Sequence, residues 1–363
     1  MVVLKSQSRL IDKPLLTTVI CLVLFGLLAV FNASVAIGLR DFNNKFYFLR
    51  SQLVWAGIGM TLMLVASQIN YEVFLRFSPL ILLAALVFLV VVLLPNFGIK
   101  ALGAKRWLEL GPISFQPAEF AKLAFVIYLA SFLAKKKDFW RFVSILGVFV
   151  LLIIAEPDLG TAVAVASIGM VLYFVAGASV LEAFFLGVLG VLGVLGAIFS
   201  SAYRKRRLLS LFNPLTDPLG SSYHIRQALI AIGSGGFWGL GLGQSRQKFE
   251  YLPEVTTDSI FAVICEELGF LGAVVLIALF LIVLVRIFKI AKACPEERGT
   301  LLAVGVGSWL GVQTLVNLGA MVALLPLTGV PLPFISYGGS SLIVSLVAVG
   351  IVLNISKHKT VRK

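Results

Sequence analysis

Long apolar segments recur along almost the whole chain and are separated by shorter polar ones. The apolar residues run continuously and do not alternate with a period of two, so the pattern predicts helices and excludes a membrane barrel of strands. Each segment is long enough to cross a bilayer, which takes roughly 20 residues. Ten segments are predicted to span the membrane: residues 15–38, 51–68, 77–95, 117–134, 141–156, 159–177, 180–200, 259–287, 299–325 and 339–357.

The predicted fold class is an all-α polytopic membrane protein with ten transmembrane helices. Residues 1–363 would form a single integral membrane domain, with a large extracytoplasmic loop at residues 201–257, between helices 7 and 8. Composition agrees, because 60% of the residues are hydrophobic and 13% are charged. A soluble domain has about 25% charged residues. A soluble enzyme, a secreted disulfide scaffold and a disordered chain are therefore excluded.

The distribution of basic residues orients the chain. Ten spans place both termini on one side, and a cytoplasmic N-terminus puts most lysines and arginines in inner segments, as expected for membrane proteins. The net charge of +13 comes from short clusters between spans. Such clusters suit contact with anionic membrane lipid, and no nucleic-acid partner is expected. The basic run Arg204–Arg207 is the exception, since it lies on the predicted outer side, where it either meets phosphate or forms a solvated patch.

Asp258 is the leading candidate for a chemical role. It lies where the long loop enters the eighth predicted span. One interpretation is an ordinary acid stabilised by the helix dipole, which would lower its pKa and weaken it as a general base. A catalytic aspartate would need apolar surroundings that raise its pKa, or a bound cation that activates the hydroxyl.

Two further pairs of charged residues each have a structural and a functional interpretation. Glu119 and Lys122 are spaced i, i+3 on one helix face within the fourth span, either as a structural ion pair or in contact with substrate. Glu156 and Asp158 flank Pro157 between two spans. They form either a turn with a helix-capping aspartate or an acidic rim for a cation or sugar hydroxyls.

Glycines at 233–243 are typical of an irregular or re-entrant segment at the membrane surface. A nucleotide-binding loop is disfavoured, because no strand precedes these glycines and no P-loop lysine follows them. Glu266 and Glu267 follow Asp258 two helical turns later, so at least one of them should face the interior of the bundle.

Five strings, in this order, resemble the SEDS family, which includes RodA, FtsW and SpoVE, and the resemblance covers nearly the whole chain. They are Arg106-Trp107, Gln116-Pro117-Ala118-Glu119-Phe120-Ala121-Lys122, Glu156-Pro157-Asp158-Leu159-Gly160-Thr161, Tyr251-Leu252-Pro253-Glu254 with Thr257-Asp258, and Pro331-Leu332-Pro333-Phe334-Ile335-Ser336-Tyr337-Gly338-Gly339-Ser340-Ser341. The segment from Ala231 to Lys248 is closer to the FtsW and SpoVE branch than to RodA. Ser259 departs from the pattern, since an aromatic residue usually follows the aspartate.

The resemblance implies a peptidoglycan glycosyltransferase of the bacterial cytoplasmic membrane that polymerises lipid II with a class B penicillin-binding protein, for cell division or for cell shape and elongation. The family's essential aspartate falls on Asp258, and its buried acid–base pair on Glu119 and Lys122. The aspartate would take a proton from, or orient, the acceptor hydroxyl, with inversion at the donor sugar. Supporting or substrate-binding positions are then Arg106, Glu119, Lys122, Glu156, Arg246, Lys248, Ser336 and Ser340.

Three outer cations, Arg106, Arg246 and Lys248, are expected to stabilise the departing pyrophosphate. No cofactor is certain from the sequence, and a divalent cation, Mg²⁺ or Mn²⁺, that assists these three residues is left open. Two other functions remain: a flippase or transporter of lipid II, and a non-catalytic scaffold for a penicillin-binding protein. A flippase needs charged groups through the membrane and a cavity that opens on both sides, whereas a scaffold would be indifferent to Asp258→Asn.

Overall fold

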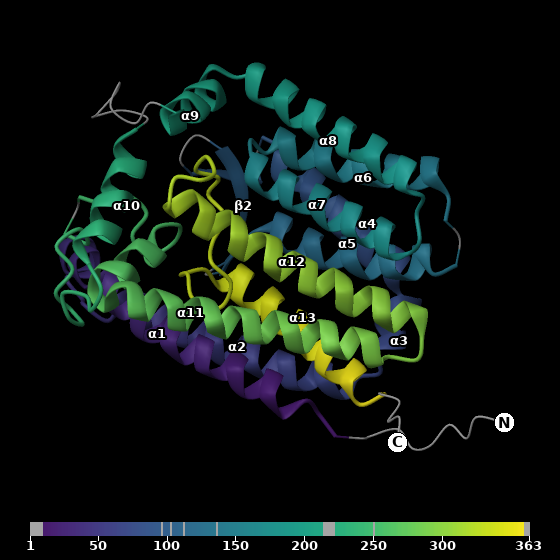
Figure 1. The fold of residues 1–363 in the computed structure, drawn as a ribbon, viewed down its shortest axis with the longest axis horizontal. Helices are drawn as coiled ribbons and strands as arrows, with labels where there is room; N and C mark the ends of the chain where they lie inside the picture. The colour runs from purple at the N-terminus through teal and green to yellow at the C-terminus, as the bar shows by residue number, and fades with distance from the viewer. Residues whose placement is uncertain are drawn as a thin grey trace.

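The computed structural model describes residues 10–358 except 96, 102–103, 112, 136, 213–221 and 250, and it is mostly helical (Figure 1). The helices are α1 (Lys13–Phe42), α2 (Tyr47–Gln68), α3 (Tyr71–Arg76), α4 (Ser78–Leu93), α5 (Pro117–Leu133), α6 (Phe139–Ala155), α7 (Leu159–Val175), α8 (Val180–Phe199), α9 (Ala202–Phe212), α10 (Tyr223–Ser234), α11 (Ile260–Ala293), α12 (Glu297–Met321) and α13 (Gly339–Ser356).

Each of the ten apolar segments coincides with one helix, namely α1, α2, α4 to α8 and α11 to α13. Six of these helices, α1, α2, α8, α11, α12 and α13, are long and apolar enough to cross a membrane. Of the predicted all-α fold with ten transmembrane helices, the structure therefore supports a mostly helical chain with helices that can cross a membrane.

The helices α12 and α13 form the centre of the bundle. In each of them 83% of the most apolar stretch is buried, against 11% in α8 at the edge. The beginning of α1 meets the end of α13 at one end of the bundle, where the Asp12 amide donates to Ser356 Oγ at 3.0 Å. Helices α9 and α10 lie at the opposite end, together with strand β2 (Figure 1). The loop between α12 and α13 reaches the same end, so the long loop and this connection share one face.

A small antiparallel sheet precedes α5 and was not anticipated from the sequence. Its strands are β1 (Gly98–Ala101), β2 (Ala104–Leu110) and β3 (Ile113–Phe115), in the order β1-β2-β3. Leu108 on β2 pairs with Phe115 on β3. This pairing holds Arg106 on the central strand rather than on an unstructured loop.

The glycine-rich segment after α10 packs against a break in α11. Gly269 has φ 66°, a conformation that interrupts the helix and favours glycine. The backbone amides of Leu240 and Gly241 donate to the carbonyls of Glu266 and Glu267, both at 3.0 Å. Backbone amides of the glycine-rich segment thus satisfy two carbonyls next to the break in α11. The prediction of an irregular segment here is confirmed.

Candidate functional site

Asp258 lies in a short irregular segment immediately before α11, and neighbouring elements hold its backbone. Asn317 Nδ2 on α12 donates to the Asp258 carbonyl at 3.0 Å. Ser336 Oγ, in the α12–α13 connection, donates to the Thr257 carbonyl at 2.6 Å. The Tyr337 amide donates to the Thr256 carbonyl at 2.8 Å. The segment that presents Asp258 is therefore fixed by residues about 60 to 80 positions later in the chain.

The surroundings of Asp258 favour the proton-bearing form of its carboxyl. The side chain keeps a small exposed fraction, yet protein surrounds it, and this burial raises its pKa to about 7, with further raising by the charges of Glu254 and Asp158. The guanidinium groups of Arg207 and Arg106 act in the opposite direction. Of the two conditions stated for a catalytic aspartate, the structure supplies the first, a pKa that burial of the carboxyl raises.

Arg106 reaches from β2 to the turn between α6 and α7. Its Nε donates to the Glu156 carbonyl at 3.2 Å, its Nη2 donates to the Pro157 carbonyl, and its Nε lies 3.9 Å from Asp158 Oδ2. Asp158 Oδ1 accepts the Thr161 amide at 3.0 Å and so caps α7. The interpretation of Asp158 as a helix cap is confirmed, and the same carboxylate helps to orient Arg106.

Gly329 lies beside both Asp258 and Arg106. A Cβ on this glycine would lie 3.6 Å from Asp258 Oδ2 and 3.8 Å from Arg106 Nη1. Gly329 has φ 76°, a backbone conformation that disfavours any residue with a side chain. Beside Arg106, Glu156 is fully buried and neither of its carboxyl oxygens has a hydrogen-bond partner among the described residues. The site therefore combines a carboxylate that takes up a proton near neutral pH with a facing guanidinium.

Glu119 and Lys122 form a buried ion pair behind this site. Lys122 Nζ lies 2.8 Å from Glu119 Oε1 and donates to Gln313 Oε1 on α12, also at 2.8 Å. Gln313 Nε2 in turn donates to the Pro331 carbonyl at 2.9 Å. Both charged side chains are 1% exposed. This geometry favours the structural ion pair over contact with substrate, because the pair connects α5, α12 and the α12–α13 connection.

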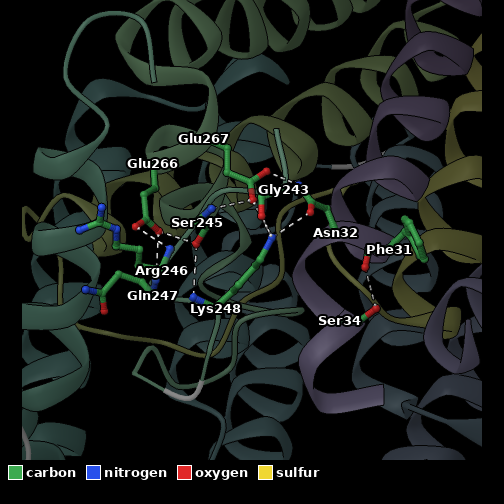
Figure 2. A network of polar contacts seen from close by, with 10 residues as sticks. All are labelled: Phe31, Asn32, Ser34, Gly243, Ser245, Arg246, Gln247, Lys248, Glu266 and Glu267. Carbon is green, nitrogen blue, oxygen red and sulfur yellow. Dashed lines mark hydrogen bonds and ion pairs between the residues drawn. The ribbon is translucent and has the colours of Figure 1, made fainter. Parts of the chain in front are cut away.

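Arg246 and Lys248 belong to a separate network between α1 and α11, shown in Figure 2. Lys248 Nζ lies 3.0 Å from Glu267 Oε1 and donates to Asn32 Oδ1 at 3.0 Å. The Arg246 amide donates to Glu266 Oε1 at 3.0 Å, while its side chain is exposed. Both glutamates are buried, which confirms the expectation for this pair. Because Lys248 is 4% exposed and its ammonium is already bound, its position favours a structural role over pyrophosphate binding.

The two serines of the α12–α13 connection have structural partners. Ser336 also accepts the Leu332 amide at 2.8 Å, and so closes the turn that leads to α13. Ser340 Oγ accepts the Gln116 amide at 3.1 Å and donates to the Ser114 carbonyl at 3.4 Å. These contacts join the first turn of α13 to the end of the small sheet. Both serines therefore support the site by fixing its walls.

Sequence reasoning missed Asn317 and Gly329 and left the role of Arg207 open between phosphate contact and a solvated patch. Arg207 on α9 donates to the Leu327 carbonyl at 3.0 Å and contributes positive charge at Asp258, although the basic run alone did not reveal its direction. Asn317 was detectable as an uncharged polar residue within a predicted span, a feature that often marks a buried partner. Gly329 gave no sequence signal, because its role depends on what lies on either side.

The side chains around Asp258 offer few ligands for a divalent cation. Within the described ranges, no group of three or more His, Cys, Asp or Glu side chains is arranged to hold a metal ion. The carboxylates near Asp258 are instead separated by Arg106 and by backbone contacts. The described residues therefore provide no preformed metal site made of protein side chains alone, and the proposed reaction uses no metal.

Comparison with known proteins places this arrangement in a family. The family model described as "Cell cycle protein" (FtsW, RodA, SpoVE) matches residues 13–361. Stage V sporulation protein E of Bacillus subtilis (strain 168) is 42% identical over 355 residues, covering 96% of this chain and 97% of the relative. The probable peptidoglycan glycosyltransferase FtsW of Trichlorobacter lovleyi is 38% identical, covering 98% of this chain and 96% of the relative.

Solved structures agree with the sequence comparison. A chain in the structure described as "Structural coordination of polymerization and crosslinking by a peptidoglycan synthase complex" has a TM-score of 0.79 and 30% identity, covering 96% of this chain and 98% of that one. The rod shape determining protein RodA of Thermus thermophilus has a TM-score of 0.71 and 29% identity, with 97% and 98% covered. With a family model that matches almost its full length and relatives aligned from end to end, this chain belongs to the FtsW/RodA/SpoVE family of SEDS proteins, near FtsW and SpoVE.

Proposed function

We propose that this protein is a peptidoglycan glycosyltransferase that polymerises lipid II at the outer face of the bacterial cytoplasmic membrane. One observation carries the proposal: Asp258, whose pKa is raised to about 7, and the guanidinium of Arg106 lie on the two sides of Gly329. Relatives named as probable peptidoglycan glycosyltransferases add support. The alternative scaffold function gives no reason for a carboxylate held in this state.

In the proposed reaction, Asp258 accepts the proton of the acceptor sugar's 4-hydroxyl as that oxygen attacks the anomeric carbon of the donor. The bond from that carbon to the pyrophosphate breaks, and the configuration inverts. A pKa near 7 suits a general base that works at neutral pH. Arg106 and Arg207, the two guanidinium groups that act on Asp258, stabilise the leaving pyrophosphate. A single base and a stabilised leaving group suffice for inversion, so no second catalytic carboxylate is needed.

The proposed membrane arrangement has ten spans, with α9, α10 and the site on the outer side and both termini in the cytoplasm. The concentration of lysine and arginine in the predicted inner loops supports this orientation. A class B penicillin-binding protein is the proposed partner. A structural neighbour described as part of a peptidoglycan synthase complex supports an assembly of this kind.

The test uses purified protein in liposomes with lipid II and the class B penicillin-binding partner, followed by gel separation of glycan strands. We expect strands from the wild type and none from Asp258→Ala or Asp258→Asn. A matched control is Asp41→Asn, which changes an exposed aspartate at the end of α1. Strand formation by both Asp258 variants would overturn the proposal.

The same preparation separates the other two functions. Transfer of lipid II between leaflets without polymer would identify a flippase. Polymer that depends only on the partner, and is unchanged by Asp258→Asn, would identify a scaffold. Charged pairs within the bundle, such as Glu119–Lys122, are already engaged in helix packing, which gives the flippase less support.

A further inference from the structure

Asp258 lies in a tight turn that begins at Glu254 and ends at the start of α11. Glu254, which has φ 51°, accepts the Thr257 and Ser259 amides at 3.2 and 3.0 Å through its carbonyl. These bonds close a tight turn immediately before α11. A turn of this kind sets the direction in which the intervening Asp258 side chain leaves the backbone.

Ser259 stands at the N-cap of α11 but does not cap it. A serine at this position usually accepts a backbone amide from the first turn of its helix. In the described structure Ser259 makes no such bond, and its hydroxyl donates instead to the Pro253 carbonyl at 2.8 Å. The hydroxyl is therefore used to fasten the turn rather than the helix.

His224 on α10 completes this arrangement. Its Nε2 lies 2.6 Å from Ser259 Oγ, which is fully buried. A hydroxyl has one proton, and that of Ser259 is donated to Pro253, so His224 must be the donor and must carry its proton on Nε2. A continuous chain of hydrogen bonds thus runs from α10 through Ser259 to the start of the Asp258 turn.

We propose that His224 is a positioning residue that holds Asp258 in place through the Ser259 hydroxyl; this inference rests on the proposed function. The imidazole of His224, supplied by another helix, binds the serine and keeps the turn rigid.

His224 acts as a fixed donor rather than as a second base. Burial lowers its pKa to about 4, and the guanidinium of Arg207 contributes in the same direction. The imidazole is therefore neutral near pH 7, where Asp258 changes its protonation. The pH dependence of polymerisation should consequently report Asp258, and His224 should influence it only by moving that carboxylate.

The test compares His224→Ala, Ser259→Ala and His224→Gln for lipid II polymerisation, with kcat, KM and the pH profile measured for each. Loss of the bond should lower kcat by about 10- to 100-fold with little change in KM, because displacement of a reacting group by about 1 Å is that costly. Glutamine supplies an N–H donor, so His224→Gln should retain activity within about threefold of the wild type, since it preserves the hydrogen bond. The double variant His224→Ala/Ser259→Ala should be no worse than either single change.

The matched control is Arg226→Gln, an exposed change on the same helix, and it should leave kcat and the pH profile unchanged. Hydrogen–deuterium exchange of the peptide that contains 253–259 provides a readout without activity. Exchange should rise in His224→Ala and Ser259→Ala but not in His224→Gln. Unaltered kcat and pH profile in His224→Ala, in a preparation whose wild type polymerises, would refute this inference and leave the proposed function intact. If the wild type forms no polymer, the proposed function fails, and unchanged exchange in His224→Ala would independently refute the positioning role.

Discussion

The buried ion pair of α5 offers a direct test of how this bundle is held together. The perturbation is Lys122→Met, which keeps a long side chain but removes the charge. It deletes two contacts of 2.8 Å, one to Glu119 Oε1 and one to Gln313 Oε1. Gln313 Oε1 would still accept a hydrogen bond from Trp309 Nε1 at 2.7 Å, so Glu119 is the residue that would lose its partner.

The magnitude follows from the state in which Glu119 is left. Its other carboxylate oxygen, Oε2, has no hydrogen-bond partner among the described residues, so the variant would leave a carboxyl that is 1% exposed with no partner. Removing one member of a buried ion pair lowers the free energy of unfolding by about 3–5 kcal/mol. Replacing both members should cost less, because no isolated charge remains.

The assay is the thermal unfolding midpoint of detergent-solubilised protein for Lys122→Met, Glu119→Gln and the double variant. We expect a large decrease for Lys122→Met and partial recovery in the double variant. Arg40→Met is the matched control, since it breaks an exposed pair with Asp41 whose side chains are 54% and 40% exposed. Exposed pairs contribute little, so this control should unfold at the wild-type temperature.

Two results would refute this reasoning. One is a midpoint for Lys122→Met equal to that of Arg40→Met. The other is a double variant that is less stable than Lys122→Met, which would mean that Glu119 is not destabilised by loss of its partner. Either result would show that the pair does not hold α5 to α12.

Three further predictions concern the site and the glycine-rich segment. Because Asp258 binds a proton below a pH of about 7, the polymerisation rate should fall as the pH decreases through this value. Glu254→Gln removes a negative charge that raises the pKa of Asp258. In this variant the acid limb of the pH–rate profile, where the rate falls, should therefore move to lower pH. Arg106→Ala removes a positive charge that lowers the Asp258 pKa, so the limb should move to higher pH, and kcat should fall by about 100-fold through loss of leaving-group stabilisation. Gly239→Ala would place a Cβ 2.2 Å from a backbone carbonyl of α11 and should lower the thermal midpoint. Gly193→Ala in α8 would place its Cβ within 4 Å of no atom of the described residues, so it should leave the midpoint unchanged. Equal thermal midpoints for the two glycine variants would contradict the predicted role of Gly239. Acid limbs that move in the opposite directions would contradict the predicted effects of Glu254 and Arg106 on the pKa of Asp258.

The sequence by itself determined the helical part of this protein. Continuous apolar stretches coincide with helices because a chain in lipid has to satisfy its backbone polar groups internally, and a helix does so within one segment. Interactions between residues close in the sequence could also be predicted. The Asp158 cap and the Glu119–Lys122 pair depend on residues three positions apart, and the structure contains both.

Only the tertiary structure decided which of the candidate residues meet. The pKa of Asp258 depends on burial by segments far away in the chain. The charge of Arg207 acts on Asp258, whereas Lys248 forms an ion pair with Glu267. The small sheet around Arg106 was invisible because its short strands lie between spans and have no strong alternating pattern. Contacts of this kind join residues tens to hundreds of positions apart, and a periodic pattern reports only which face of its own helix is apolar. Desolvation, charge and space at the site arise from all neighbours at once, so they exist only after the helices have packed.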